Sequence, residues 1–258
     1  MKKLKSLGVV AAATILLTSC LDGNNESSLN GFGVIDYSDD FRMVAYIDDY
    51  TPVYSPVFKD LQKDDCIFFT STYSSDDPAN NGTNKYLTVT NAAVLNKLEK
   101  GRFVPQVDTT NIMPGEIAAM DAGVLNYSYT QYSFTNHNFL FVGSSHEKVA
   151  SDQSNSCEYI LQYDYNQEPQ TVDGKRVYDF FLHVVKKADG KGVPGTNPFN
   201  YVFDTQGYFK TLQSRETAAG NETLNIRFNY IKEFNKDSTA ATWGKSQVYQ
   251  TAIYKENK

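Results

Sequence analysis

The histidines and their neighbours are the residues on which catalysis by a side-chain base would depend. The string Ser144–Glu147 (SSHE) brings hydroxyl, imidazole and carboxylate groups close together in the sequence. A nucleophilic serine needs a base that an acid orients, but no Gly-x-Ser-x-Gly turn is present. A zinc protease would need a second histidine four positions after His146, where the chain has Ala150. We therefore expect a solvent-facing loop here and no catalytic residue.

The other two histidines have no recognisable motif around them. His183 alternates onto the same strand face as Asp179, where a lone imidazole is typical of an exposed strand position. His137 lies between two asparagines and indicates a turn. Neither pattern predicts a metal or a cofactor, and we expect none.

The acidic loops of the first half resemble metal sites at first sight. The longest is Ser75–Asn84 (SDDPANNGTN). A calcium loop needs oxygen ligands at alternate positions before a glycine, but Ala79 stands between Asp77 and Asn81 where a ligand is required. This segment is therefore predicted to be a solvated hairpin loop.

The first twenty residues have the features that direct export and acylation. Three lysines precede Leu7–Leu17, an apolar run of eleven residues. Such a run suits a signal-peptide core and is too short to cross the roughly 30 Å hydrocarbon core of a bilayer. It ends in Leu17–Cys20 (LTSC), which resembles the bacterial lipobox. Residues 1–19 are therefore expected to be a cleaved signal peptide, and Cys20 is expected to carry a lipid that anchors the chain to a membrane.

Loss of residues 1–19 would leave 239 residues and remove three lysines, so the mature chain would carry 21 basic and 30 acidic residues, a formal net charge of −9. Nucleic-acid binding depends on clustered lysine and arginine that displace counterions. The sequence has no such cluster, so we expect no nucleic-acid partner. The length fits one large domain or two ordinary ones.

Two further cysteines, Cys66 and Cys157, lie far apart in a chain that is expected to enter a compartment where disulfides persist. One bridge between them is conceivable. Each cysteine also begins an apolar, strand-like run, and a free cysteine behaves as a small buried hydrophobe. We favour two separate buried thiols.

The first part of the mature chain is predicted to be a tether followed by a small barrel. Residues 20–30 are small and polar, which is typical of a flexible tether. Five runs rich in β-branched and aromatic residues then follow within about 65 residues, the strand count of a closed OB-type barrel. The predicted strands are Phe32–Tyr37, Phe41–Ile47, Pro52–Phe58, Cys66–Tyr73 and Tyr86–Leu95.

The second part is predicted to be an antiparallel β-sandwich. Pro114-Gly115 interrupts the strand pattern and leads into Glu116–Met120, for which we expect one helical turn, so the barrel is assigned to residues 31–112 and the sandwich to 113–258. Asp173-Gly174 indicates a hairpin. No helix-period stretch of ten or more residues is present. The predicted strands are Asn138–Val142, Cys157–Tyr165, Val177–Val185, Phe199–Asp204, Leu224–Tyr230 and Gln247–Tyr254.

This order of features resembles the NigD-like lipoproteins of the Bacteroides group. The matching segments are Leu17–Asp22, Lys63–Phe69 (KDDCIFF), Tyr86–Leu98 and the final pair Leu224–Phe234 with Gln247–Tyr254. The resemblance implies an OB-like barrel and a β-sandwich behind a lipobox, without an assigned activity or site residues. An acidic run after the lipid cysteine directs surface display in that group. Here it is diluted to Asp22 and Glu26, so the periplasmic face and the cell surface of the outer membrane both remain open.

These observations favour a non-catalytic binding protein of the cell envelope with a protein or glycan partner. The 18 tyrosines and 16 phenylalanines suit a carbohydrate-stacking face or a sandwich core. A carbohydrate-binding lipoprotein, an envelope hydrolase and an immunity-type envelope factor are the alternatives. Two triplets, Asp108-Thr109-Thr110 and Asp237-Ser238-Thr239, resemble acceptors for O-linked glycans, which makes Thr109 and Ser238 candidate modification sites.

Overall fold

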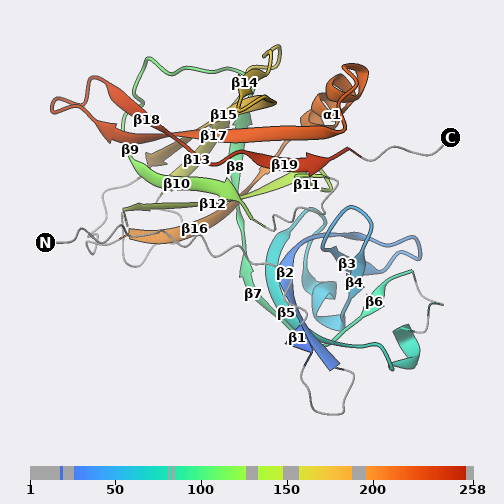
Figure 1. Cartoon of the computed structure of the whole chain (residues 1–258). Helices are drawn as coiled ribbons and strands as arrows, with labels where there is room; N and C mark the ends of the chain where they lie inside the picture. Colours follow the sequence, from blue (N-terminus) through green and yellow to red (C-terminus); the bar gives the residue numbers. More distant parts are fainter. Residues whose placement is uncertain are drawn as a thin grey trace, which may run out of the picture.

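The computed structural model describes residues 18–19, 26–80, 82, 85–125, 133–147, 157–187 and 196–253. Cys20 and most of the expected signal peptide lie outside the described residues. The described chain is built of β-strands in two domains, a small barrel and a larger curved sheet (Figure 1). The predicted all-β class is therefore confirmed. No helix in the described part of the chain is long and apolar enough to span a membrane.

The smaller domain is a nearly closed, barrel-like sheet of seven strands. Its strands follow the order β6-β4-β3-β2-β5-β7, and only Val89 separates β6 from β7, so the two ends of the sheet meet. A short 3-10 helix, η1, places the buried ring of Phe58 edge-on against Phe69 in the barrel core. The elements are β1 (Thr18–Ser19), β2 (Glu26–Tyr37), β3 (Met43–Tyr46), β4 (Pro52–Tyr54), η1 (Pro56–Asp60), β5 (Cys66–Ser74), η2 (Pro78–Asn80), β6 (Leu87–Thr88) and β7 (Thr90–Lys97).

The first long strand begins earlier than the sequence predicts. The expected tether reaches residue 30, but β2 starts at Glu26, which pairs with Ser74 of β5. Leu29 is buried in the barrel, and the Ser71 hydroxyl donates a hydrogen bond to its carbonyl oxygen. Polar residues join the strand here because cross-strand pairing with β5 satisfies their backbone groups, which composition alone does not reveal.

The larger domain is one continuous mixed sheet that curls over a single core. Its main path is β10-β12-β16-β8-β13-β15-β17-β18, in which β8 pairs in parallel with both β13 and β16. The elements are β8 (Glu99–Val104), β9 (Glu116–Ile117), β10 (Ala119–Val124), β11 (Thr135–Asn136), β12 (Phe139–Glu147), β13 (Cys157–Gln162), β14 (Gln170–Val172), β15 (Lys175–Lys186), β16 (Thr196–Asp204), α1 (Tyr208–Ala218), β17 (Thr223–Phe234), β18 (Ala241–Lys245) and β19 (Tyr249–Ala252).

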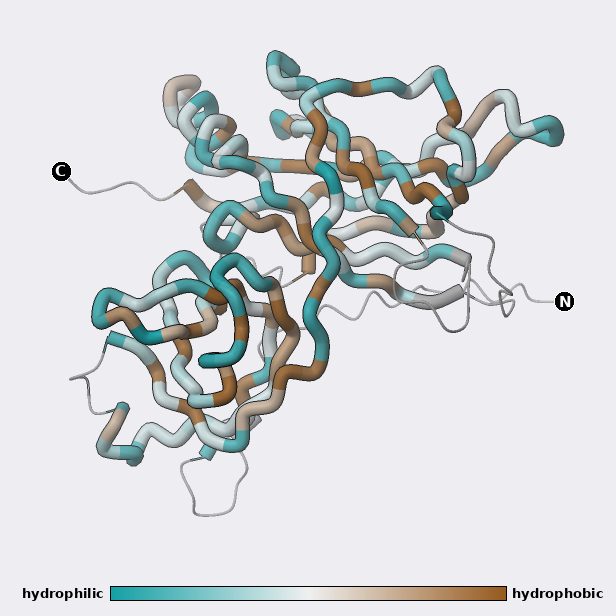
Figure 2. Tube along the Cα trace, turned by 180° about the vertical axis from the view of Figure 1, so that it is seen from behind, coloured by the Kyte–Doolittle hydropathy of each residue, from teal (hydrophilic) through white to brown (hydrophobic). Residues whose placement is uncertain are grey.

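The two sheets divide at Leu98 and not at residue 112. β7 ends at Lys97 and β8 begins at Glu99, so the chain passes between domains along two consecutive strands (Figures 1 and 2). Sequence reasoning placed the boundary at the Pro114-Gly115 break. That break is only the loop before β9, because β8 is an internal strand of the larger sheet and not part of the barrel.

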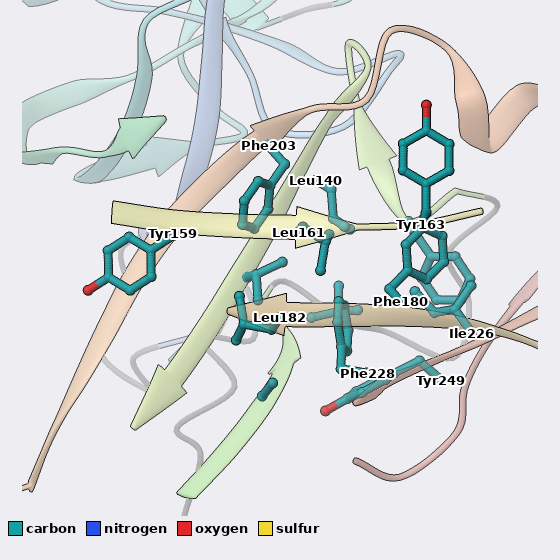
Figure 3. Packing of buried hydrophobic residues seen from close by; sticks show 14 of the residues in the cluster. Leu140, Tyr159, Leu161, Tyr163, Phe180, Leu182, Phe203, Ile226, Phe228 and Tyr249 are labelled. Atoms are coloured by element: carbon teal, nitrogen blue, oxygen red, sulfur yellow. The ribbon is translucent and has the colours of Figure 1, made fainter. Parts of the chain in front are cut away.

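Apolar side chains occupy alternate positions in the predicted strands Val177–Val185 and Leu224–Tyr230. These side chains lie in the core of the larger domain. Phe180 and Leu182 of β15 and Ile226 and Phe228 of β17 are buried together (Figure 3). The Asp173-Gly174 hairpin is also confirmed: Val172 pairs with Lys175, and both turn residues have positive φ, at 50° and 76°. Two-residue hairpin loops of this kind match the twist of the flanking strands.

Two expectations for local structure are wrong. Residues 208–218 form the helix α1, although the sequence predicted no helix of this length. Glu116–Met120 was expected to be a helical turn, but Glu116–Ile117 pairs with β15, and Ala119 begins β10. In both segments long-range packing decides the structure, because neither segment has a strong hydrophobic period.

The domains meet through a shared apolar cluster, which we call the joint cluster. Phe32 of β2 contacts Phe68 of β5, with ring centroids 4.9 Å apart, and Phe141 of β12, at 5.7 Å. Polar contacts border it, since the Asn136 amide donates to the Tyr46 carbonyl oxygen at 2.5 Å. The buried members of the joint cluster are Phe32, Val34, Cys66, Leu98, Leu125, Phe139, Phe141 and Val202.

Candidate functional site

The turn between β2 and β3 presents an exposed phenylalanine in an unusual backbone conformation. The Ser38 N–H donates to the Arg42 carbonyl oxygen, and the Phe41 N–H donates to the Ser38 carbonyl oxygen. The second bond closes a tight turn that leaves Phe41 with φ of 61°. Glycine or asparagine normally takes this left-handed position, because a Cβ atom crowds the backbone there. Phe41 is nevertheless 86% exposed.

Arg42, the residue after Phe41, lies against two tyrosines. The Arg42 guanidinium carbon is 5.3 Å from the ring centroid of Tyr54 and 5.8 Å from that of Tyr86. The two tyrosine rings are 5.3 Å apart and tilted by 48°. Tyr86, Tyr54 and Asp40 all raise the pKa of Arg42, so the guanidinium stays charged. We call the set of the exposed residues Phe41 and Arg42 with the half-buried Tyr54 and Tyr86 the Phe41 surface.

Closure of the barrel brings this surface together. Tyr54 ends β4 and Tyr86 precedes β6, and these strands pair in parallel where the barrel closes. Lys85 and Asp39 form an exposed ion pair at 2.6 Å, which ties the segment before β6 to the β2–β3 turn. The charges around the surface cancel, because Arg42 pairs with Asp40 and Lys85 pairs with Asp39.

His146 is buried, contrary to the expectation of a solvent-facing loop. Ser144–Glu147 belongs to β12, which pairs with β16. The His146 ring stacks on Phe199 with centroids 4.0 Å apart, and its Nε2 atom is 3.0 Å from the Tyr159 hydroxyl. Burial raises the pKa of Tyr159. An imidazole in this position is a core side chain that a substrate in solution cannot reach.

His183 was expected to be exposed, and this prediction is also wrong. Its side chain is 1% exposed, and its Nδ1 atom is 2.5 Å from Oε1 of Glu116, whose side chain is 0% exposed. The edge of the neighbouring Trp243 indole packs against the imidazole. Alternation along β15 correctly placed His183 opposite the core. Sequence reasoning missed Glu116, since no local signal shows that the segment before β10 covers this face.

The barrel of this chain resembles a known group of domains. Residues 23–95 match a family model described as a lipoprotein OB domain. The barrel is therefore similar to this group of OB domains, and we refer to it below as the OB domain. This match confirms the resemblance to Bacteroides lipoproteins that the sequence predicted. No curated protein matches the sequence.

Solved structures resemble the chain over most of its length. An uncharacterized protein from Parabacteroides merdae is 27% identical, with a TM-score of 0.77 over 88% of this chain and 100% of that one. A putative lipoprotein from Bacteroides fragilis is 10% identical, with a TM-score of 0.50 over 90% and 100% of the two chains. A NigD-like immunity protein from Bacteroides caccae is 13% identical, with a TM-score of 0.43 over 83% and 91%. The chain therefore shares its overall fold with the protein from Parabacteroides merdae.

The third histidine lies where the OB domain meets the larger domain. His137 has φ of 49° in the turn between β11 and β12, as its asparagine neighbours predicted. Its ring contacts that of Tyr46, with centroids 4.1 Å apart and planes tilted by 37°, and its backbone N–H donates to Asp49. Its Nδ1 atom is 3.5 Å from Asp36. Burial raises the pKa of Asp36. Lys63, the Tyr37 N–H and His137 lower the pKa by more than burial raises it, so the pKa lies below its ordinary value.

Asp77 and Asn80 make local hydrogen bonds in the described part of the polar loop after β5. The Asn80 amide donates to the carbonyl oxygens of Ser74 and Thr88, and its side-chain oxygen accepts the Thr88 N–H. Asp77 accepts the Ala79 N–H. Among the described residues, no group of three or more histidine, cysteine, aspartate or glutamate side chains is placed to hold a metal ion.

The two candidate glycan acceptors have similar surroundings. Thr109 and Ser238 are both exposed. In each triplet the aspartate accepts hydrogen bonds from the backbone N–H and the hydroxyl of the third residue: Asp108 from Thr110, and Asp237 from Thr239. The middle hydroxyl of each triplet therefore lies on an accessible turn, and both residues remain proposed modification sites.

Cys66 and Cys157 are separate buried thiols, as predicted. Cys66 lies in the joint cluster, where burial raises its pKa to about 12. A thiol that stays protonated is a poor nucleophile. We therefore expect Cys66 to be unreactive in the folded chain.

We predict two measurable consequences for Cys66. In a Cys157→Ala variant of residues 21–258, a thiol reagent at pH 8 should modify Cys66 only in unfolding concentrations of urea. The unfolded thiol ionises near 9 and the folded thiol near 12, so the stability from this group is present below pH 9 and is lost as the pH rises to 12. The loss should reach at most about 1.4 kcal/mol per pH unit. A Cys66→Ala variant should lack this part of the alkaline decline, and rapid modification of the folded chain would contradict the assignment.

Proposed function

We propose that this chain is a non-catalytic binding protein, anchored by a lipid to the outer membrane, and that its Phe41 surface receives a protein partner. The observation that carries the proposal is Phe41 itself. A large apolar ring that is 86% exposed is held at a turn tip by a backbone conformation that L-residues disfavour. That conformation costs on the order of 1–2 kcal/mol. Strain of this kind persists where function needs it.

The neighbours of Phe41 suit a protein interface. Exposed aromatic and arginine side chains are the residue types that dominate binding energy in such interfaces. Arg42 offers a planar guanidinium whose side chain is 51% exposed. Four more large apolar residues are exposed on the OB domain, at positions 37, 50, 57 and 95, against two in the described part of the larger domain. The barrel is therefore the better candidate for the binding domain.

A carbohydrate ligand is the second candidate, because OB barrels bind oligosaccharides across this side of the fold. A sugar platform needs open, flat ring faces. Here the Tyr54 and Tyr86 rings are tilted by 48°, and Arg42 lies over both. A hydrolase has less support, since His146 and His183 are buried in the sheet. We therefore expect a glycan array to show no binding that depends on the Phe41 surface; saturable binding that Tyr54→Ala or Tyr86→Ala removes would instead favour the carbohydrate ligand.

The decisive variant is Phe41→Gly. Glycine accepts the left-handed conformation, so we expect the free energy of unfolding to stay level or to rise by up to about 1 kcal/mol. Site-specific photo-crosslinking from position 39 in intact cells should give a discrete adduct with the parent chain and none with Phe41→Gly. Urea unfolding measures the stability of both.

Met120→Ala is the matched control, because Met120 is 61% exposed on β10 of the larger domain. It should leave the crosslinked adduct intact. An adduct that survives Phe41→Gly at the parent yield would remove the Phe41 surface from the proposal.

The anchoring part of the proposal has its own test. The lipobox-like string Leu17–Cys20 supports acylation of Cys20. A Cys20→Ala variant should leave the membrane fraction after a salt wash, whereas the parent chain should remain there. Retention of the variant would contradict lipid anchoring.

A further inference from the structure

The loop between β8 and β9 encloses a small pocket on the larger domain, away from the Phe41 surface. The pocket has a volume of about 210 Å³. The backbone N–H of Asp108 donates to Oε1 of Gln162 at 2.8 Å, which attaches this loop to β13. The lining residues are Val104, Gln106, Asp108, Asn111, Met113 and Gln162.

One wall of the pocket is a turn that its own aspartate holds. The Asp108 carboxylate accepts the backbone N–H groups of Thr110 and Asn111, the Thr110 hydroxyl and the Asn111 side-chain amide, all within 3.0 Å. These bonds hold the pKa of Asp108 far below its usual range, the Asn111 side chain contributing most. The carboxylate is thus engaged within the turn, which keeps one shape.

Met113, on the other wall, is attached through a buried pair. The Glu116 carboxylate accepts the Met113 N–H at 2.9 Å and lies 2.5 Å from Nδ1 of His183. Ile117 then pairs with Val184 of β15. The two oxygens of this one carboxylate thus join Met113 to His183 of β15. Here the pair holds Met113 in place beside the pocket.

Beside the Asp108 carboxylate, which the turn occupies, the uncharged carboxamides around the pocket offer complementary hydrogen bonds. The Gln162 side-chain oxygen accepts the Asp108 N–H, and the Asn111 side-chain nitrogen donates to the Asp108 carboxylate. The second polar atom of each carboxamide is left for a ligand. Those atoms are a donor on Gln162 and an acceptor on Asn111, and Gln106 adds a third carboxamide. Val104 and Met113 supply apolar surface.

A secondary amide has the matching acceptor and donor and an apolar methyl group beside them. We infer that this pocket binds a secondary amide, carried by an N-acetylated sugar or by a peptide. Its volume is below the 300–1,000 Å³ typical of drug-sized sites, so it suits a single such group. The site is independent of the Phe41 surface, because it is built from the β8–β9 loop and β13.

Ligand-observed saturation-transfer NMR on the mature lipoprotein tests this inference. The probes are N-acetylglucosamine and N-acetylalanine methylamide, with glucose as the probe that lacks an amide. At least one amide probe should give saturable transfer, and glucose should give none. Transfer from the sugar alone or from the peptide alone identifies the source of the amide. No transfer from either amide, or equal transfer from glucose, would overturn the inference.

Variants decide whether the signal comes from this pocket. Gln162→Leu and Asn111→Ala should each weaken amide binding at least tenfold, and Gln247→Leu, an exposed glutamine elsewhere, should leave it unchanged. Asn111 is exposed, so Asn111→Ala keeps the test available if Gln162→Leu does not fold. Phe41→Gly should not affect the amide signal. Unchanged binding by Asn111→Ala and by any folded Gln162→Leu chain would place the ligand elsewhere and overturn the assignment.

Discussion

Phe32→Ala should lower the free energy of unfolding by about 3–5 kcal/mol, the usual cost of truncating a buried phenylalanine. Phe32 is 2% exposed, and its ring contacts Phe68 in the OB domain and Phe141 in the larger domain. The variant therefore loses packing within the barrel and between the domains at once. Differential scanning calorimetry should show the single transition of the parent chain replaced by two, with the OB domain melting first.

Leu95→Ala is the control for this variant, because Leu95 is 60% exposed on β7 of the same domain. Surface substitutions usually change stability by less than about 0.5 kcal/mol. A single transition in Phe32→Ala at an unchanged temperature would show that the joint cluster does not couple the domains.

Asp179→Ala should cost about 3–5 kcal/mol, the range measured when one partner of a buried ion pair is removed. The Asp179 carboxylate accepts two hydrogen bonds from Arg227, at 2.8 and 2.9 Å, and one from Asn229 at 2.9 Å. The side chains of Asp179 and Arg227 are 7% and 8% exposed. Without the carboxylate, the guanidinium is left buried without its counter-charge. Urea unfolding measures the loss.

The double variant Asp179→Leu with Arg227→Met separates the charge from the packing. Replacing a buried pair by apolar residues of similar volume is often close to neutral. The double variant should therefore be clearly more stable than Asp179→Ala. If the double variant lost as much stability as Asp179→Ala, the uncompensated charge would not be the cause.

Much of the fold could be predicted because the strands of this chain carry their own pattern. Alternation along β15 and β17 gave the core-facing residues correctly, and Asp173-Gly174 predicted its hairpin. The helix α1 could not be found in this way. It has few apolar positions, and its inward-facing Glu216 accepts hydrogen bonds from Arg176 and Tyr178 on β15. Those partners lie about forty residues away in sequence, so no local period reports them.

The candidate sites show the same limit. Strand alternation placed His183 opposite the core, but its exposure depends on Glu116 and Trp243, which come from other elements. Sequence reasoning made Phe41 the first residue of the strand Phe41–Ile47, but β3 begins at Met43 and Phe41 lies in the turn before it. Its left-handed backbone was not predictable, because the residue there is neither glycine nor asparagine. That departure from the usual turn composition is the signal that sequence reasoning missed.

Strand β2 sets the path of mechanical load through an anchored protein of this kind. Its first residue, Glu26, follows the lipid tether proposed here, and its last, Tyr37, leads into the turn that carries Phe41. At about 3.3 Å per residue the strand spans roughly 40 Å. Tension between a membrane and a partner held at Phe41 would run along this one strand. Nine residue pairs join the strand to β5, and the tension would load all of them in shear at the same time. The larger domain would stay outside the line of force.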